Sequence, residues 1–403
     1  MKILVIHNYH RKGSASGDDQ VFKNETALLE KKGHQVIRYT TRNDLFDQAS
    51  LIGKIKYMLG MKWSKEHYKK VDQIIKDQKP DIVHVHTFFP LLSPSILYAA
   101  KKNKCKVVAT LHDTRFICPC ATSLRNNNLC NECKDGRYFR MCKYKCFKNS
   151  FIQSFIVASV FHYHRKHQTF YNQIDRYICL NDNQIELLKA TGFDMKKITK
   201  KYNFVEDNKN VRKQFDESLP KRFVCFYGRI GEEKGIRVLM KIWDKINGIP
   251  LVVMGDGPLE KEFALWAETK DNVYFKGYVD HDKCLSIVKA SEFVVFPSIW
   301  YEGCSMVEIE TQNLGKPIIA TDLGFSAEAI VDGYNGLKVK LGDINGFCNA
   351  VKKLWDNPEL LQKMEKNSRK EYEKKYTPND NYRQLMNIYQ LELNKEINTI
   401  ENK

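Results

Sequence analysis

The sequence lacks a hydrophobic run long enough to cross a membrane. A membrane-spanning helix needs roughly 18–20 consecutive apolar residues, whereas the longest apolar stretch, FIQSFIVASVF at 151–161, is far shorter. A secretory signal is also missing, because ILVI after Lys2 is too short for its apolar part and is followed by polar His7 and Asn8. We therefore expect a cytoplasmic protein, where the reducing environment disfavours disulfides between its twelve cysteines.

The first half of the chain has few acidic residues for its many basic ones. Residues 1–220 hold 39 Lys and Arg against 21 Asp and Glu, whereas residues 221–403 hold 26 against 27. The net charge of +17 therefore comes from the first half. This excess suggests an anionic partner, which could be a membrane surface, a phosphorylated substrate or a nucleic acid. A basic surface that only keeps the protein soluble is the alternative.

Short β-branched runs alternate with helical patterns along the 403 residues, which are enough for two domains. Continuous apolar runs are typical of strands buried on both faces of a parallel sheet, with helices covering those faces. The pattern predicts an α/β fold of two Rossmann-like, doubly wound domains. The expected strands cover residues 2–7, 35–40, 81–86, 106–112 and 176–181, and then 223–228, 251–257, 273–279, 293–297 and 317–322.

The polar stretch 206–222 separates the two series of strands and indicates a linker. The first domain then covers 1–205 and the second 223–375. Within the C-terminal segment 376–403, residues 381–397 have apolar positions three and four apart, as a helix does. Ligands of open α/β sheets bind beyond the carboxyl ends of the strands, so polar residues directly after strands are the first candidates for chemistry.

Two glycine-containing turns follow strands of the second domain. In GRIGEEKG, Arg229 and Lys234 place two cations on a flexible backbone at a strand end, which suits a diphosphate. A surface turn with solvated charges is the alternative. In VVMGDGP, Gly255 and Gly257 would let a ligand approach the backbone closely, although many strand–helix turns have this composition.

The stretch SIWYEGCSMVEIETQNLGKP, residues 298–317, carries three glutamates after a strand that ends at Pro297. Ser305 and Glu308 fit a capping box that starts a helix, which stops at Gly315. Backbone N–H groups at 303–307 would bind an anion with the help of the helix dipole. Glu302 and Glu310 flank this anion site and suit hydroxyl groups, so together they indicate a sugar nucleotide.

The spacing of Glu302 and Glu310, E-x7-E, resembles the donor domain of retaining GT-B glycosyltransferases of family 4. GRIGEEKG, GDGP, GKPIIATDLG and DGYNGL in the second half strengthen the resemblance, and DIVHVHTFFPLL, TLHDTRF and KNETALLEKKGHQV resemble the acceptor domain of that family. The resemblance covers nearly the whole chain. It implies two domains that face a cleft and a final helix that crosses back to the first domain.

The resemblance also implies roles for individual residues. Arg229 and Lys234 would neutralise the diphosphate, Glu302 would hold sugar hydroxyls and Glu310 the ribose. His112 would lie near the reacting sugar, and Gly17 in a loop near the phosphates. The sequence departs from the family pattern at Ser16, before Gly17, and at Phe325, where glycines are common. The expected donor-binding residues are Gly17, Arg229, Lys234, Gly255, Gly257, Glu302, Gly303, Cys304, Ser305, Met306, Val307 and Glu310, and Glu302, His112, Arg229 and Lys234 are also the expected catalytic residues.

Preorganised cations and helix amides can stabilise the charge of a departing diphosphate, a task that a divalent metal performs in other enzymes. We therefore expect metal-independent transfer with retention of configuration, without a catalytic cofactor. The resemblance alone suggests UDP as the nucleotide and a polysaccharide of the cell surface as the product.

Six cysteines fall within an insert at 118–146. The C-x2-C and C-x3-C spacings in a polar loop favour a structural zinc site, and a set of reduced, metal-free thiols is the alternative. Similar inserts in the family suggest Cys118, Cys130, Cys133 and Cys146 as the zinc ligands.

The stretch LIGKIKYMLGMKWSKEHYKK, residues 51–70, mixes large apolar residues with six lysines. This composition suits a helix on an anionic membrane surface, and a core helix with a basic outer face is the alternative. We expect a peripheral protein at the inner face of the cytoplasmic membrane, acting on a glycan or a lipid-diphosphate-linked acceptor.

Two other functions fit parts of the sequence. A sugar-nucleotide epimerase would use the same architecture but leaves the basic half and the insert unexplained. A zinc-bearing nucleic-acid binder would use the charge and the cysteines, but its cations are not interleaved with a stacking platform of aromatic residues. We therefore expect no nucleic-acid partner.

Overall fold

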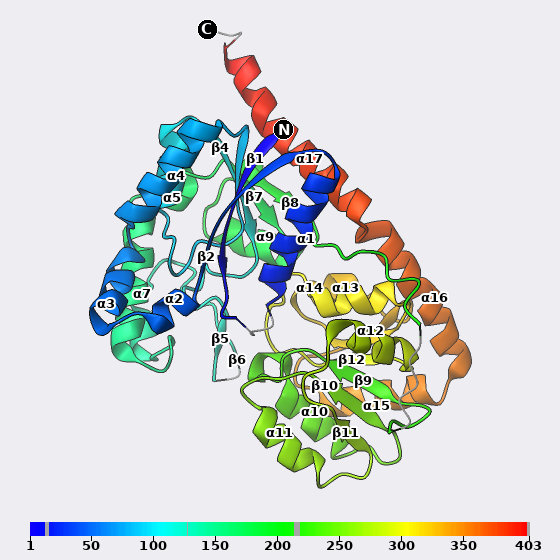
Figure 1. The fold of residues 1–403 in the computed structure, drawn as a ribbon. Helices are drawn as coiled ribbons and strands as arrows, with labels where there is room; N and C mark the ends of the chain where they lie inside the picture. Colours follow the sequence, from blue (N-terminus) through cyan, green and yellow to red (C-terminus); the bar gives the residue numbers. More distant parts are fainter. Residues whose placement is uncertain (13–15, 127, 213–217, 401–403) are drawn as a thin grey trace. The chain divides into compact units, whose positions relative to one another are not determined.

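The computed structural model describes residues 1–12, 16–126, 128–212 and 218–400, and the side chains up to residue 394. The chain divides into two compact units. Unit 1 consists of Met1–Ser123, Cys130–Asn203 and Asn379–Lys403, and unit 2 of Leu124–Leu129 and Phe204–Pro378. Each unit contains one six-stranded parallel sheet with helices on both faces (Figure 1), so the prediction of two doubly wound α/β domains is confirmed.

The sheet of unit 1 has the strand order β2-β1-β3-β4-β7-β8. The order reverses between β1 and β3, and such a reversal opens a crevice at the carboxyl ends of the two strands. The strands are β1 (Lys2–Tyr9), β2 (Gln35–Arg42), β3 (Ile82–Val85), β4 (Lys106–Leu111), β7 (Arg176–Cys179) and β8 (Ile198–Lys200).

Alternate residues of β1 pack into two hydrophobic cores, one on each face of the sheet. Leu4 and Ile6 join one core, and Ile3 and Val5 join the other. The helices of unit 1 are α1 (Gly17–Lys31), α2 (Asp44–Gln48), α3 (Leu51–Gly60), α4 (Lys65–Gln78), α5 (Ser95–Lys102), α6 (Arg140–Lys143), α7 (Phe151–Lys166), α8 (Thr169–Asn172), α9 (Asp182–Ala190), the 3₁₀ turn Met195–Lys197 and α17 (Pro378–Ile400).

The sheet of unit 2 has the order β11-β10-β9-β12-β13-β14, which is the classic dinucleotide-binding order. Its strands are β9 (Val224–Tyr227), β10 (Leu251–Met254), β11 (Val273–Phe275), β12 (Val294–Phe296), β13 (Ile318–Thr321) and β14 (Gly336–Val339). Its helices are the 3₁₀ turn Glu232–Lys234, α10 (Ile236–Trp243), α11 (Glu260–Ala267), α12 (His281–Ala290), α13 (Met306–Asn313), α14 (Gly324–Ala329), α15 (Ile344–Trp355) and α16 (Pro358–Lys375). A separate hairpin pairs β5 (Leu124–Arg125) with β6 (Asn128–Leu129).

All ten predicted strands are present, and their ends differ from the prediction by one to four residues. The sequence analysis missed β8 and β14, the outermost strands at one edge of each sheet. These strands are short, with three and four residues, and ITK and GLKV contain polar or small residues that break the apolar run. An edge strand has a neighbour on one side only, so its sequence pattern is weaker.

The C-terminal helix α17 packs on the sheet of unit 1, although unit 2 precedes it in the chain (Figure 1). Leu385, Ile388 and Tyr389 lie in the core that contains Ile3, Val5 and Phe22. The predicted helix at 381–397 is therefore confirmed, and it is longer than expected at both ends. The crossing that the family resemblance implied is present.

The segment predicted as a linker, 206–222, contains no helix or strand in its described parts, 206–212 and 218–222. It is attached to unit 2 rather than loose. Asn313 donates to the carbonyl of Glu206, and Arg369 forms an ion pair with Asp207. Within the described residues, no helix is long and apolar enough to cross a membrane.

Candidate functional site

In unit 2 the order of strands reverses between β9 and β12. The loop after β9 contains GRIGEEKG, and the loop after β12 contains Glu302, so the reversal brings these two separate stretches of sequence together. Gly235 allows the closest approach of the loops, since a Cβ there would collide with the carbonyl oxygen of Pro297. Its φ of +73° also favours glycine.

Lys234 and Glu302 form an ion pair, with 2.7 Å between the ammonium nitrogen and carboxylate Oε1. The Ser298 hydroxyl donates to the same oxygen at 2.8 Å. The Lys234 ammonium also lies over the rings of Phe296 and Trp300, at 5.5 and 5.3 Å from their centroids. The cation expected at the diphosphate and the acid expected at the sugar are therefore partners of each other. The carboxylate of Glu302 is buried and accepts from both Lys234 and Ser298.

Gly255 and Gly257 do not leave open backbone for a ligand, as the turn suggested. A Cβ on Gly255 would collide with the carbonyl of Gly228, and one on Gly257 with that of Ile230. The two loops are also joined by a hydrogen bond from the Ile230 N–H to the carbonyl of Asp256, 2.7 Å long. The glycines therefore support the loop that carries Arg229 and Lys234, because they allow its backbone to pack against theirs.

The start of α13 lies directly after the loop of Glu302. The Ser305 hydroxyl accepts a hydrogen bond from the N–H of Glu308, which confirms Ser305 as the N-cap. Met306 and Val307 are the first residues of the helix, and N–H groups in the first turn have no acceptor within the helix. Gly303 and Cys304 precede them in the loop. This backbone has the position that the anion-site hypothesis requires.

The second half of the predicted capping box is wrong. Glu308 is fully buried, and neither of its carboxylate oxygens has a hydrogen-bond partner among the described residues. Burial and the nearby charge of Glu302 raise the pKa of Glu308 to about 8, although Ser326, Lys234 and Ser305 oppose the shift. At neutral pH this side chain is mainly a neutral acid.

Glu310 is buried about one turn from the start of α13. Burial raises its pKa to about 8. Nε2 of the His281 ring lies 3.5 Å from carboxylate Oε1 of Glu310. A buried carboxyl group with one weak partner can form further hydrogen bonds, as the proposed contact with ribose hydroxyls requires.

Arg229 is the most accessible of the four expected catalytic residues. Its side chain is half exposed, and its Nε lies 3.6 Å from the carboxylate of Glu233. This distance allows an ion pair but is too long for a good hydrogen bond. The guanidinium can therefore bind a diphosphate without first losing a strong partner.

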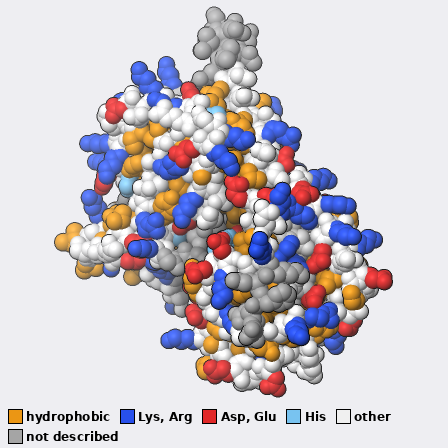
Figure 2. Space-filling model, turned by 45° about the vertical axis from the view of Figure 1, so that its right-hand side comes forward, with side chains coloured by type: hydrophobic (Ala, Val, Ile, Leu, Met, Phe, Trp, Pro, Cys, Tyr) orange, Lys and Arg blue, Asp and Glu red, His pale blue; other side chains and the backbone are white. Residues whose placement is uncertain are grey.

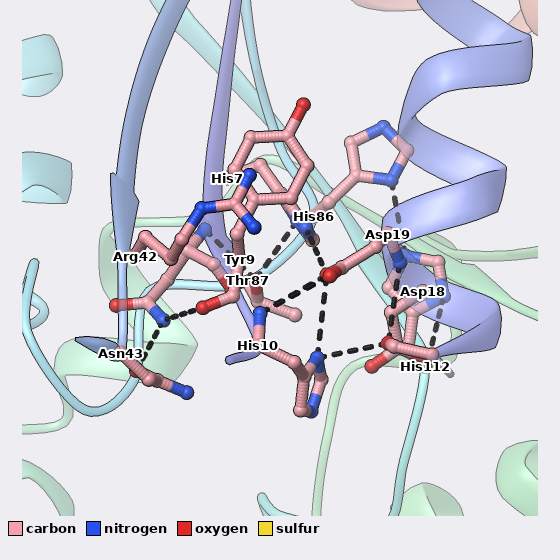
Figure 3. A network of polar contacts seen from close by, with 12 residues as sticks. His7, Tyr9, His10, Asp18, Asp19, Arg42, Asn43, His86, Thr87 and His112 are labelled. Carbon is pink, nitrogen blue, oxygen red and sulfur yellow. Dashed lines mark hydrogen bonds and ion pairs between the residues drawn. The ribbon is translucent and has the colours of Figure 1, made fainter. Parts of the chain in front are cut away.

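In unit 1 a cluster of histidines lies at the reversal between β1 and β3 (Figure 3). His7 and His10 come from the end of β1 and the residue after it, His86 follows β3 and His112 follows β4. The sequence analysis singled out only His112. Like His112, His7 and His86 are the last residues of their predicted strands, so the same position could have marked them as candidates too.

Asp19 in the first turns of α1 joins this cluster. Its Oδ1 is 2.9 Å from Nε2 of His7 and 3.3 Å from Nδ1 of His10, and its carboxylate accepts from the N–H of His10. Burial alone would raise the pKa of Asp19, but the hydrogen bonds from His10 and His7 outweigh it and hold the pKa well below its usual range. Gly17, expected in a loop, is instead the first residue of α1, and residues 13–15 before it lie outside the described residues.

A second acid of α1, Glu25, is also fully surrounded by protein. Its Oε2 is 2.9 Å from the ammonium of Lys201, and its Oε1 is 3.1 Å from Nε2 of His86. His84 lies 3.2 Å from the same oxygen. Lys201 holds the pKa of Glu25 well below its usual range against the effect of burial.

Glu25, His84 and His86 are the one group in the described part of the chain whose metal-ligating atoms lie within 4.8 Å of one another. The surroundings do not suit a metal ion. Lys201 already neutralises Glu25, and both ring nitrogens of His84 have partners, the hydroxyls of Tyr389 and Thr110. A cation would have to displace an ammonium group and break these bonds.

The cysteine insert lies outside that group. Its thiols are free of disulfides, and Cys120, which the zinc hypothesis left out, lies beside Cys118 and Cys146. The contact with Cys120 lowers the pKa of Cys118 to about 6, although burial opposes the shift. Burial raises the pKa of Cys133 to about 12, and Cys118, Cys146 and Cys130 add to the shift. Among the described residues no three thiols lie within 4.8 Å of one another, and zinc in the insert stays a prediction.

Helix α3 has no buried residue, so the first half of the stretch 51–70 is not a core helix, whereas Met61 and Tyr68 in the second half pack against the core of unit 1. Leu51 and Ile52 are 77% and 81% exposed. Figure 2 shows orange hydrophobic side chains projecting at the left edge of the molecule, with blue basic side chains near them. The exposed apolar residues of this region are Leu51, Ile52, Ile55, Leu59, Trp63, Phe139, Tyr144, Phe151, Ile152 and Phe155, which we call the apolar face.

Comparisons with known proteins match both halves of the chain to family models. Residues 19–209 match the model described as Glycosyltransferase Family 4. Residues 207–371 match the model described as Glycosyl transferases group 1. One relative is 2-deoxystreptamine N-acetyl-D-glucosaminyltransferase of Niallia circulans, 24% identical over 85% of this chain and 81% of that protein. Another is O-antigen chain mannosyltransferase C of Escherichia coli, 23% identical over 91% of this chain and 86% of that protein.

Solved structures agree on the fold. Sucrose-phosphate synthase from Thermosynechococcus elongatus superposes with a TM-score of 0.70 at 16% identity and covers 97% of this chain and 98% of its own. Anabaena HepE in complex with UDP superposes with a TM-score of 0.64 at 15% identity and covers all of both chains. With both sheets built as in these proteins and residues 19–371 matched by the two models, the chain belongs to the GT-B glycosyltransferases of group 1 and family 4.

Proposed function

We propose that the protein is a retaining glycosyltransferase that transfers a sugar from a UDP-sugar to a hydroxyl group of a glycan or lipid-linked acceptor, in the synthesis of a cell-surface polysaccharide. UDP is chosen because HepE, which has the same fold, was solved with UDP. The polysaccharide is chosen because an O-antigen chain mannosyltransferase and a capsular polysaccharide biosynthesis glycosyltransferase, CapM of Staphylococcus aureus, are among the relatives.

The observation that carries this proposal is the contact between Lys234 and Glu302 beside the start of α13. One ammonium has three N–H donors, and Glu302 uses one of them. Lys234 can therefore hold Glu302 and still donate to a phosphate oxygen. Glu302 would then hold a sugar hydroxyl beside this phosphate, and Glu310, within α13, would hold the ribose.

During the proposed reaction the bond between the anomeric carbon and the diphosphate oxygen breaks, and the electron pair stays on that oxygen. Lys234, Arg229 and the start of α13 stabilise the new negative charge. The acceptor oxygen bonds to the anomeric carbon on the same face, and its proton passes to the departing diphosphate. This electrostatic role needs no divalent cation, so the proposed transfer is metal-independent.

The direct test is donor turnover by the purified protein with a panel of UDP- and GDP-sugars in the presence of EDTA. We expect release of UDP and a product with the anomeric configuration of the donor, as determined by NMR. An inverted product would contradict retention. Loss of turnover in EDTA without unfolding would contradict metal independence. Conversion of the donor into its epimer without any acceptor would favour the epimerase instead.

We also propose that the apolar face binds an anionic membrane surface, which would place the protein at the inner leaflet beside a lipid-linked acceptor. Helix α3 carries Lys54 and Lys56 among its exposed apolar side chains, so hydrophobic insertion and attraction to anionic lipids would act together. The turn after α3 contacts α7, since Nε2 of His164 bonds to the carbonyl of Lys62 at 2.9 Å.

Flotation with vesicles that contain anionic lipid tests the membrane proposal. The Ile52→Ser and Leu59→Ser double variant should lose most of the bound fraction, because each change removes an exposed apolar side chain from the apolar face. The matched control is Leu265→Ser in α11, which removes an equally exposed leucine from outside this face. Equal binding by both variants, or no binding of the native protein, would contradict the proposal.

A structural zinc ion in the insert stays a prediction, with Cys118, Cys130, Cys133 and Cys146 as its ligands. Metal analysis of the purified protein tests it, and the prediction requires one zinc per chain. Cys133→Ser should remove the metal, whereas Cys348→Ser, in α15 of unit 2, should not. A native protein without zinc would leave the insert as a set of reduced thiols.

A further inference from the structure

The catalytic histidine proposed in unit 1, His112, belongs to a chain of polar contacts that runs into the core. Nε2 of His112 lies 3.0 Å from Nδ1 of His86, and Nε2 of His86 lies 3.1 Å from the carboxylate of Glu25. The rings of His86 and His112 are also stacked, with 5.2 Å between their centroids. Neither His86 nor Glu25 is among the residues that the family resemblance assigned.

The protonation of this chain follows from its charges. Glu25 and Lys201 are both buried, and their charges cancel across 2.9 Å. A proton that made His86 cationic would therefore leave a net positive charge in the core, close to His84 and His112, which costs free energy. With Glu25 already balanced by Lys201, the arrangement in which His86 carries a single N–H adds no charge to this part of the core.

The direction of each hydrogen bond is then determined. A carboxylate only accepts, so the N–H of His86 is on Nε2 and points to Glu25. Nδ1 of His86 is left as an acceptor, and the atom facing it, Nε2 of His112, must supply the hydrogen. A neutral His112 with its proton on Nε2 has a lone pair on Nδ1.

We propose that Glu25 and His86 are positioning residues that hold His112 in the tautomer with its proton on Nε2, so that Nδ1 accepts a hydrogen bond from a sugar hydroxyl. This inference rests on the proposed function, which places His112 at the donor sugar. The carboxylate of Asp18, 3.9 Å from Nδ1 of His112, is a second acceptor on the same side. Nδ1 of His112 and the carboxylate of Asp18 would together accept from a ligand with hydroxyl donors, and they would repel an anion. Burial lowers the pKa of His112 well below its usual range, which keeps the ring neutral.

The first test is spectroscopic and does not depend on activity. Protein with ¹⁵N-labelled histidine gives long-range ¹H–¹⁵N correlations that distinguish protonated from unprotonated ring nitrogens, and His112→Gln identifies the signals of His112. The proposal predicts a protonated Nε2 and an unprotonated Nδ1 in the native protein. A proton on Nδ1 would overturn it. In His86→Leu the two tautomers should mix.

The second test is kinetic. His86→Leu should lower kcat about 10- to 100-fold, with little change in KM for the donor, because the orientation of a catalytic group is lost while the nucleotide contacts remain. His86→Asn should recover part of this loss, since its amide oxygen can replace Nδ1 as the acceptor. His167→Leu, a change at an exposed histidine, is the control.

The two tests separate this inference from the proposed function. Unchanged kcat in His86→Leu, with the control also unchanged, would overturn the positioning role even if sugar transfer is observed. A correct tautomer in a protein that turns over no sugar nucleotide would support the chain of contacts and contradict the proposed function.

Discussion

The two units bury acids at equivalent places, directly beside the point where the strand order reverses, yet the acids behave in opposite ways. In unit 2, burial raises the pKa values of Glu308 and Glu310 to about 8. In unit 1, Asp19 and Glu25 have pKa values well below the usual range, although burial opposes this. The difference lies in the partners, because histidines and a lysine surround the acids of unit 1.

This contrast shows that burial alone does not decide the charge of an acid. Glu25 is as buried as Glu308, but it has Lys201 at 2.9 Å and a histidine ring at 3.1 Å, whereas Glu308 has no hydrogen-bond partner among the described residues. Glu302 belongs to unit 2, like Glu308, but it is paired with a lysine, like Glu25, because Lys234 forms an ion pair with it. The paired acid is the one proposed for catalysis.

The largest expected effect comes from removing either partner of the Lys234–Glu302 ion pair in unit 2. Lys234→Ala and Glu302→Gln should each lower kcat about 10²- to 10⁴-fold, because they remove charge that stabilises the transition state. Turnover of the UDP-sugar identified in the panel measures the loss, and circular dichroism checks the fold. Lys241→Ala, at an exposed position of α10, is the control. Native turnover in both active-site variants would contradict the assignment of the donor site.

In unit 1, the ion pair between Glu25 and Lys201 should instead contribute to the stability of the fold. Lys201→Met should lower the free energy of unfolding by about 3–5 kcal/mol, because it leaves Glu25 as an unpaired buried charge. The double variant Glu25→Gln with Lys201→Met removes both charges and should lose clearly less than the sum of the single variants. Urea unfolding measures all of them. Additive losses would show that the two side chains are not coupled.

The unpaired acid Glu308 should make the protein less stable as the pH rises. Its pKa is higher in the folded protein, about 8, than in the unfolded chain, about 4.5, so folding takes up a proton between these values. The cost is zero below pH 4.5 and complete above pH 8, where it is on the order of a few kcal/mol.

Glu308→Gln should therefore raise stability at pH 8 and leave it nearly unchanged at pH 5. Thermal unfolding across this pH range measures the difference, and the slope that remains should come in part from Glu310. An equal effect of the substitution at both pH values would contradict a raised pKa.

The smallest effect is expected for Asp19, whose contribution to stability grows as the pH rises, in contrast to that of Glu308. Its folded pKa lies below the unfolded value, so its contribution to stability is complete above pH 4 and is lost as the pH falls through the folded pKa. Asp19→Asn should lower stability by about 1–2 kcal/mol at pH 6 and by less at pH 3. A variant that loses as much at pH 3 as at pH 6 would show that the hydrogen bonds to His7 and His10 do not depend on the charge.

The sequence alone determined the architecture and most of the strands, because continuous β-branched runs and their alternation with helices are local properties of the chain. It also identified Lys234, Glu302 and Glu310 as candidates, since each lies in a short motif after a strand. It could not predict that Lys234 contacts Glu302, 68 residues away, because that contact depends on the strand order β9-β12.

Tertiary structure decided the rest. His86 and Glu25 come from different elements, and the family resemblance assigned a role to neither of them, so only their convergence beside His112 shows what they do. Gly255 and Gly257 appeared open to a ligand until the neighbouring loop was found packed against them. Glu308 appeared to be a capping residue until its carboxyl group was found buried without a partner. In each case the deciding contact joins residues that are distant in sequence, and such contacts leave no local pattern to read.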